Sequence, residues 1–144
     1  MTQTAAQALA AASFESDGQD YKLLRLPAGA ITAACAVIAQ IGEPFCAMVV
    51  DRREISLVLP SDAAQDFEAR LPAVAVAAET CGLITINVEM EPEMTGLVAR
   101  ISEALAGAGV PVLPFASFSR DHFLVPAERV GDALAALRDL QTRP

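Results

Sequence analysis

The chain has 144 residues, a 53% apolar composition and a formal net charge of −8. This length is enough for one compact unit or two small lobes, and the apolar fraction argues against disorder over most of the chain. The negative charge argues against nucleic acid as a partner, because its phosphates need clustered Lys and Arg.

Two further patterns bear on location and chemistry. No apolar stretch reaches the roughly 18 residues that a membrane-spanning helix requires, and residues 1–12 lack the basic segment that opens a secretion signal. Cys35, Cys46 and Cys81 are widely spaced, and there is no C-x-x-C pair for zinc or redox chemistry. We therefore expect a cytoplasmic protein with free cysteines, no metal, no cofactor and no membrane partner.

The first half of the chain is predicted to form one lobe, over residues 10–80. Residues 1–9 are expected to be disordered, although 5–12 also fit a short helix and 10–15 an edge strand. Alternating apolar residues indicate strands, and Gly or Pro residues mark the ends of helices and strands. The expected elements are a strand over 21–26, a helix over 31–41, a hairpin of strands 45–50 and 55–59, and a helix over 63–71.

The second half, over residues 81–144, is predicted to form a second lobe. An acidic loop follows its first strand and ends in Met94-Thr95-Gly96. Apolar residues at helical spacing come next, and Gly109 suits the C-terminal stop of that helix. The expected elements are a strand over 83–90, a helix over 97–108, strands over 110–118 and 123–125, and a final helix through Val130, Leu134 and Leu137.

A short internal repeat links the two lobes. Residues 53–60 resemble residues 120–126, with one residue fewer in the second copy, and each segment predicts a hairpin turn, a strand, a proline and a helix start. Such repetition favours two related lobes, although chance similarity between two hairpins is the alternative. The β-α-β-β-α order predicts an α+β fold, in which a small antiparallel sheet carries both helices on one face.

The second lobe resembles an ACT domain, the regulatory βαββαβ module of amino-acid metabolism. The residues that carry the resemblance are Met94-Thr95-Gly96-Leu97, Leu105 with Gly109-Val110-Pro111-Val112, and the run from Phe115 to Val125. The chain from about residue 10 onward is similar to small stand-alone double-ACT proteins of bacteria. Those proteins resemble the ACT pairs of aspartate kinases and the cytosolic arginine sensors. The first lobe matches less well, through residues 21–26 and 45–59.

The resemblance implies an α+β fold of tandem ferredoxin-like ACT lobes. The second lobe, however, has no strand after Leu140 to complete its sheet. Residues 21–26 are a candidate for the missing strand, and a strand shared or exchanged in this way would interlock the two lobes. Pro114 departs from the family, in which the equivalent strand commonly continues with an aliphatic residue.

The resemblance also implies an effector site between the loop before a helix of one lobe and a strand of a neighbouring lobe. The helix that begins near Thr95 exposes unpaired backbone N–H groups, which suit the carboxylate of an amino acid. Gly96 lets a ligand approach the backbone closely, and the acids before it suit an α-amino group or a basic side chain. The expected ligand-binding residues are Glu91, Glu93, Met94, Thr95, Gly96, Val112, Phe115, Ser117 and Ser119. The alternative is that these acids only favour the helix dipole and the glycine only packs.

No combination of residues predicts catalysis. His122 is the single histidine, and strand alternation places it and Asp121 on opposite faces of a strand. We therefore expect a structural strand histidine rather than a catalytic triad. The polar residues around the hairpin, Ser117 and Ser119 included, also fit ordinary turn chemistry, and the acidic loop fits a solvated surface better than a metal site.

The sequence thus predicts a non-catalytic regulatory module that binds a small ligand, most simply an amino acid. We expect a homodimer, because the exposed strand over 110–118 invites pairing with a second copy. A protein partner that reads the signal is also expected, because no enzyme is attached. The alternative is a protein interaction or oligomerisation module that has no small-molecule ligand.

Overall fold

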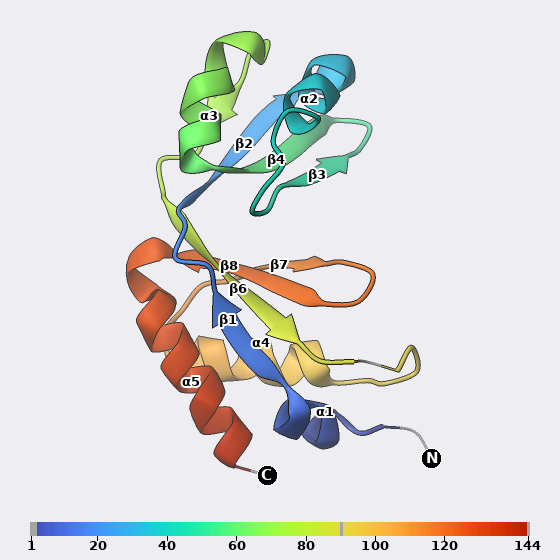
Figure 1. Ribbon diagram of the computed structural model, residues 1–144, viewed down its shortest axis with the longest axis vertical. Coiled ribbons are helices and arrows are strands. Elements are labelled where there is room, and N and C mark those ends of the chain that lie inside the picture. The colour runs from blue at the N-terminus through green and yellow to red at the C-terminus, as the bar shows by residue number, and fades with distance from the viewer. Residues whose placement is uncertain (1–2, 90, 144) are drawn as a thin grey trace. The chain divides into compact units, whose positions relative to one another are not determined.

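The computed structural model describes residues 3–89 and 91–143. The chain divides into two compact units (Figure 1). The first, called here the discontinuous unit, consists of Met1–Gly18 and Gly82–Pro144, and the second, the continuous unit, consists of Gln19–Cys81. The predicted boundary near residue 80 differs from this division at the N-terminus, because residues 10–18 lie with the second half of the chain.

The continuous unit is an antiparallel sheet with two helices. Its strand order is β5-β2-β4-β3. Apolar residues on alternate positions of the two central strands, such as Leu24, Leu26, Leu57 and Leu59, are buried in one core with the helices. The elements are β2 (Tyr21–Pro27), α2 (Ile31–Ile38), β3 (Ala47–Val50), β4 (Glu54–Pro60), α3 (Ser61–Phe67) and β5 (Ala75–Val76), with 3-10 turns at Ala28–Ala30 and Glu68–Arg70.

The discontinuous unit repeats this architecture with strand order β1-β6-β8-β7. Its core contains Ile84, Ile86, Phe123 and Val125 from the central strands, packed against three helices. Its elements are α1 (Ala5–Ala11), β1 (Ser13–Ser16), β6 (Cys81–Asn87), α4 (Leu97–Gly107), β7 (Leu113–Ala116), β8 (Asp121–Pro126) and α5 (Val130–Thr142), with a 3-10 turn at Ala127–Arg129. In a ferredoxin-like fold, the fourth strand of the sheet pairs with the first. Strand β5 takes this place beside β2 in the continuous unit, and β1 takes it beside β6 in the discontinuous unit.

The N-terminal segment supplies the fourth strand of the discontinuous unit. Strand β1 runs antiparallel to β6, with Phe14 opposite Ile86. The candidate strand over residues 21–26 instead pairs along its length with β4, while β1 pairs with four residues of β6. The reason is local: Phe14 is apolar and buried in the core of the discontinuous unit, where it removes apolar surface from water.

The expected disorder over residues 1–9 is not found in the part of this segment that the structure describes. Thr4 and Gln7 form a capping box at the start of α1, in which each side chain accepts a hydrogen bond from the other residue's backbone N–H. The side-chain amide of Gln141 then donates to the carbonyls of Leu9 and Ala12, at 2.8 and 2.7 Å. Helix α1 is thus held against the discontinuous unit.

Several strands are shorter than predicted. Strand β7 covers only part of the predicted span 110–118, since Pro111 lacks the N–H that a ladder requires. Strand β6 ends at Asn87, and Met90, which belonged to the predicted strand, lies outside the described residues.

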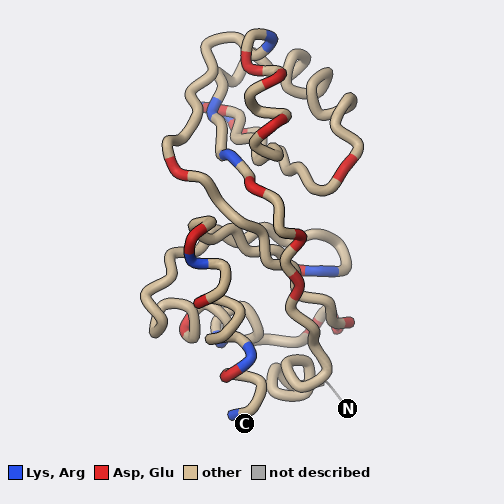
Figure 2. The backbone as a smooth tube through the Cα atoms, turned by 60° about the vertical axis from the view of Figure 1, so that its left-hand side comes forward, with Lys and Arg blue, Asp and Glu red and all other residues tan. Residues whose placement is uncertain are grey.

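Two surface properties complete the description. Acidic residues are spread along both units rather than gathered in one block (Figure 2). Within residues 3–89 and 91–143, none of the helices has the length and apolar character that crossing a membrane takes.

Candidate functional site

A hollow of about 1050 Å³ opens in the discontinuous unit. Its walls are the acidic loop between β6 and α4, the first turn of α4, and the turn between β7 and β8. Four of the predicted binding residues line it, namely Glu91, Met94, Gly96 and Ser119. The structure thus brings together the loop and turn that the sequence singled out.

Helix α4 begins at this hollow without a side-chain cap. Its N-cap is Gly96, which has φ 90° and carries no side chain that can accept a hydrogen bond. The first intrahelical bond runs from Arg100 N–H to the Gly96 carbonyl, so the N–H groups of Leu97, Val98 and Ala99 have no intrahelical acceptor. These three residues line the hollow. The positive end of the helix dipole is therefore open to an anion there.

The backbone conformation at position 96 requires a glycine, whatever binds in the hollow. A Cβ at this position would meet only the Cβ of Ala5, at an ordinary distance of 4.0 Å. The constraint is the left-handed backbone, which residues with a Cβ adopt at a cost of roughly 1–2 kcal/mol. Gly96 thus sets the angle at which the loop enters α4.

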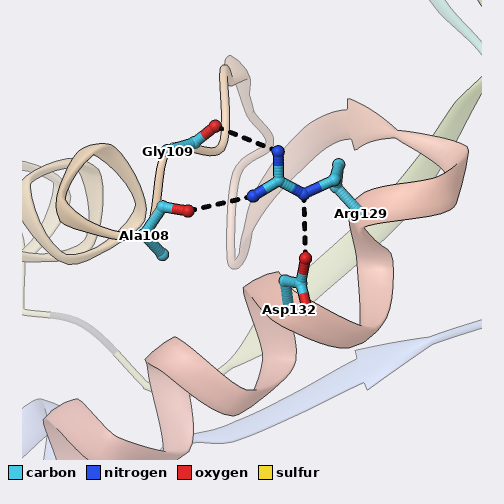
Figure 3. Close-up of polar contacts among 4 residues, drawn as sticks. All are labelled: Ala108, Gly109, Arg129 and Asp132. Atoms are coloured by element: carbon cyan, nitrogen blue, oxygen red, sulfur yellow. Dashed lines mark hydrogen bonds and ion pairs between the residues drawn. The ribbon is translucent and has the colours of Figure 1, made fainter.

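Helix α4 is held by its buried face and by its C-terminal end. One face buries Leu97, Ile101 and Leu105 in the core of the unit. At the other end, Arg129 donates to the carbonyls of Ala108 and Gly109, at 2.9 and 3.3 Å (Figure 3). Asp132 holds the same guanidinium through a 2.9 Å ion pair. A cation at this end also complements the helix dipole, so the C-terminus of α4 is capped while its N-terminus is open.

The acidic loop is tied to the N-terminal segment. The backbone N–H of Gln3 donates to Glu91 Oε2 at 2.8 Å, and the N–H of Glu91 donates to Gln3 Oε1 at 3.3 Å. Gln3 and Glu89 line the hollow with Glu91. Two predicted residues of this loop, Glu93 and Thr95, are not part of the lining.

The turn between β7 and β8 forms the opposite wall. Ser117 closes it, because its N–H and its hydroxyl both donate to the Arg120 carbonyl, at 2.9 and 2.8 Å. Phe118 at the tip is fully exposed and lines the hollow. The remaining predicted residues lie elsewhere: Val112 packs against the core, and Phe115 pairs with His122 across β7 and β8.

His122 occupies a structural position in the sheet. Its Nδ1 lies 2.9 Å from the hydroxyl of Thr85, and its Nε2 lies 3.3 Å from the hydroxyl of Ser117. Burial lowers the pKa of His122, Arg120 lowers it further, and Asp121 opposes both. A neutral imidazole whose two nitrogens each contact a hydroxyl group is consistent with the predicted strand histidine.

Sequence reasoning left eight lining residues out of the site, namely Gln3, Glu89, Pro92, Leu97, Val98, Ala99, Phe118 and Asp121. Phe118 was predicted as the end of a strand, and Asp121 was assigned to turn chemistry. Asp121 is only 8% exposed, and burial raises the pKa of its carboxyl, with an opposing influence from His122. One signal in the sequence was available. If the two copies of the internal repeat are aligned at their prolines, Pro60 and Pro126, then Asp121 aligns with Ile55. An acid therefore stands where the first copy has an aliphatic residue.

Residues 76–139 match the family model of the ACT domain. The chain is similar in structure to a protein of unknown function from Vibrio cholerae, with 26% identity over 93% of each chain and a TM-score of 0.74. It is also similar to the regulatory subunit of aspartate kinase from Thermus thermophilus, with 16% identity over 89% of this chain and 97% of that one, at a TM-score of 0.63. An aspartate kinase from Clostridium acetobutylicum matches 92% of this chain with 34% of its own, at 10% identity and a TM-score of 0.68. The predicted ACT resemblance and the predicted tandem ferredoxin-like fold are confirmed.

Proposed function

We propose that this chain, in which residues 76–139 match an ACT domain, is a non-catalytic regulatory module that binds an amino acid in the hollow of the discontinuous unit. The observation that carries the proposal is the uncapped N-terminus of α4, which opens onto that hollow. Free backbone N–H groups at the positive end of a helix suit a carboxylate. Apolar side chains of Met94, Val98 and Phe118 offer contacts for the rest of the ligand.

The proposed site gains further residues if a second copy faces it. Val112, Phe115 and Ser117 lie outside the hollow, on or beside the edge strand β7, where Leu113 is exposed. We propose a homodimer in which this edge approaches the hollow of the partner, so that these residues contact the ligand from the other copy. Binding at such a junction would couple ligand occupancy to assembly, and a partner protein in the cytoplasm would read the change.

Thermal unfolding in the presence of each of the twenty amino acids, at millimolar concentration, tests the proposal. A ligand that binds only the folded state at a hundred times its Kd adds about 2.7 kcal/mol. For a chain of this size we expect the melting temperature to rise by several degrees. A shift restricted to one amino acid, or to a few related ones, would identify the effector class.

A variant that fills the anion site makes this test specific. Val98→Glu places a carboxylate in the first turn of α4, where it favours the helix dipole and competes with the ligand. The matched control, Ala106→Glu, adds the same charge at the far end of the same helix. We expect the ligand-induced shift to disappear only in Val98→Glu. The proposal fails if no amino acid shifts the wild-type protein.

The second candidate is an interaction module without a ligand, and exposed apolar residues on edge strands favour it. Val49 and Val50 on β3 are both exposed. Light scattering on Val49→Lys separates the candidates. Loss of assembly with an unchanged amino-acid response favours the binding module, whereas loss of assembly in a protein that responds to no amino acid favours the interaction module.

A further inference from the structure

Asp121 is a buried carboxylate that faces the hollow. It is the first residue of β8, it is 8% exposed, and it lines the hollow between the first turn of α4 and the β7–β8 turn. Among the described residues, no hydrogen bond or ion pair reaches its carboxylate. His122, the next residue on the same strand, influences this carboxyl electrostatically.

The neighbouring basic side chains, Arg120 and His122, have polar contacts elsewhere. Arg120 Nη1 donates to Asn87 Oδ1 at 3.4 Å, and both ring nitrogens of His122 contact hydroxyl groups. The lining of the hollow contains no Lys or Arg within the described residues, and its other charged members are Glu89 and Glu91. The hollow is therefore negative where a ligand enters.

The repeat shows that the fold does not need an acid at this position. In the continuous unit, Asp51 N–H donates to the Glu54 carbonyl, just as Ser117 N–H donates to the Arg120 carbonyl. The residue after each turn begins the buried part of the following strand, and that residue is Ile55 in one unit and Asp121 in the other. Ile55 is fully buried in an apolar core.

A charged group in this position is unfavourable for folding unless it is paired. Partial burial raises the pKa of the Asp121 carboxyl, so the charged form is less favourable in the native state than in water. An aliphatic residue fills the same place in the sister unit without this penalty. The acid is thus explained by what enters the hollow rather than by what holds the fold.

We infer that Asp121 is the cation-binding residue of this hollow, and that the ligand presents a positively charged nitrogen, an ammonium or guanidinium group, to its carboxylate. The inference rests on the proposed function, since it concerns the same hollow. It divides the site into two parts, with the N–H groups of α4 for the anion and Asp121 for the cation. A zwitterion satisfies both. The carboxylates of Glu89, Glu91 and Asp121 do not form a group suited to a metal ion within the described residues.

Titration calorimetry and thermal shift with three sets of compounds test the inference. The first set is the twenty amino acids, the second is their N-acetyl derivatives, which lack the α-ammonium group, and the third is the amines ethanolamine, cadaverine and agmatine. The test variant is Asp121→Asn, which keeps the size of the side chain and removes its charge. The matched control is Glu103→Gln, an exposed acid on α4 outside the hollow.

We expect a cationic compound that binds the wild-type protein to bind Asp121→Asn about tenfold to a hundredfold more weakly, because a hydrogen bond between charged groups is lost. Glu103→Gln should match the wild type. Weak binding of the N-acetyl derivatives assigns the nitrogen to the α-amino group. If those derivatives of lysine or arginine still bind, the nitrogen is on the side chain.

The outcomes separate this inference from the proposed function. An amino acid that binds the wild type and Asp121→Asn equally supports the proposed function and overturns the role of Asp121. Amines that bind through Asp121 when no amino acid binds support the inference and overturn the amino-acid proposal. Binding of no compound overturns both. Circular dichroism of Asp121→Asn verifies that any lost binding does not come from lost structure.

Discussion

The two units share a strand order but differ at the corner where the first strand leads into the first helix. In the continuous unit, β2 ends at Pro27 and a single 3-10 turn, Ala28–Ala30, leads into α2. In the discontinuous unit, β6 ends at Asn87 and the chain makes an acidic loop before α4 begins at Leu97. The hollow at this corner measures about 260 Å³ in the first case and about 1050 Å³ in the second.

The charges at the two corners differ as well. The charged residues that line the small hollow are Arg25, Arg53 and Glu54, whereas those that line the large one are all acids, namely Glu89, Glu91 and Asp121. The residue after the turn is Ile55 in the first unit and Asp121 in the second. The comparison shows that this fold forms with an aliphatic residue at this position. The long loop and the buried acid of the discontinuous unit are therefore not required for folding.

The largest loss of stability should come from removing β1, the N-terminal strand that completes the sheet of the discontinuous unit. A variant that begins at residue 17 loses β1 and α1, and with them the buried Leu9 and Phe14. Each large apolar side chain contributes about 1.5–3 kcal/mol on burial, so we expect the discontinuous unit to lose its cooperative transition.

Urea unfolding followed by circular dichroism measures this effect. The continuous unit should keep its transition, because all of its strands lie between residues 19 and 81. A variant that unfolds like the wild type would show that β6 needs no partner at that edge.

An intermediate effect should follow from giving the continuous unit the acid of its sister. Ile55→Asp buries a carboxylate among leucines, at a position that does not line the small hollow of this corner. We expect a loss of roughly 3 kcal/mol or more in the free energy of unfolding at pH 7. The control is Ser56→Asp, on the opposite face of β4, for which we expect a smaller change. If both variants lost the same free energy of unfolding, the continuous unit would tolerate an acid at this position as well as the discontinuous unit does.

The smallest effect, and one of opposite sign, should come from Asp121→Asn in the absence of ligand. Folding raises the pKa of this carboxyl. Such a group adds stability below its unfolded pKa, and this contribution is lost as the pH rises through the folded pKa. At neutral pH the variant should therefore be more stable than the wild type, and the difference should shrink on acidification toward pH 4.

Chemical denaturation at a series of pH values measures this difference. Because Asp121 also raises the pKa of His122, the difference between the two proteins reports the Asp121 carboxyl together with its electrostatic influence on His122. A wild type that is more stable than the variant at pH 7 would indicate that the carboxylate has a stabilising partner.

Much of the fold was predictable because periodic apolar patterns decide it. The alternation in β2, β4 and β6 and the helical spacing of Leu97, Ile101 and Leu105 are properties of neighbouring residues. Pairing between distant segments does not follow from such local patterns, and the sequence alone did not predict that β1 pairs with β6. Only the packing of Phe14 in the core makes that choice.

The site was predicted in part for the same reason. The acidic loop and Gly96 stand out as a helix start, and the hollow lies there. Asp121 was assigned to turn chemistry because an acid after a hairpin turn is common on a surface. Its importance depends on burial, which the local pattern does not reveal. Thr95 was expected in the site because a helix start exposes N–H groups, and Glu93 because an acid suits an amino group. The lining of the hollow contains Glu91 and Met94 from this loop but neither Glu93 nor Thr95.

The position of β1 at the start of the chain affects the order in which the two units fold during translation. The continuous unit has all of its strands in one stretch, so it can fold as soon as residue 81 leaves the ribosome. The sister unit has a much higher contact order, because Phe14 must wait for Ile86, and Gln141 closes the bond to Leu9 last of all. The half of the chain that holds the hollow is therefore the last to form, and the nascent protein acquires its scaffold before it acquires its site.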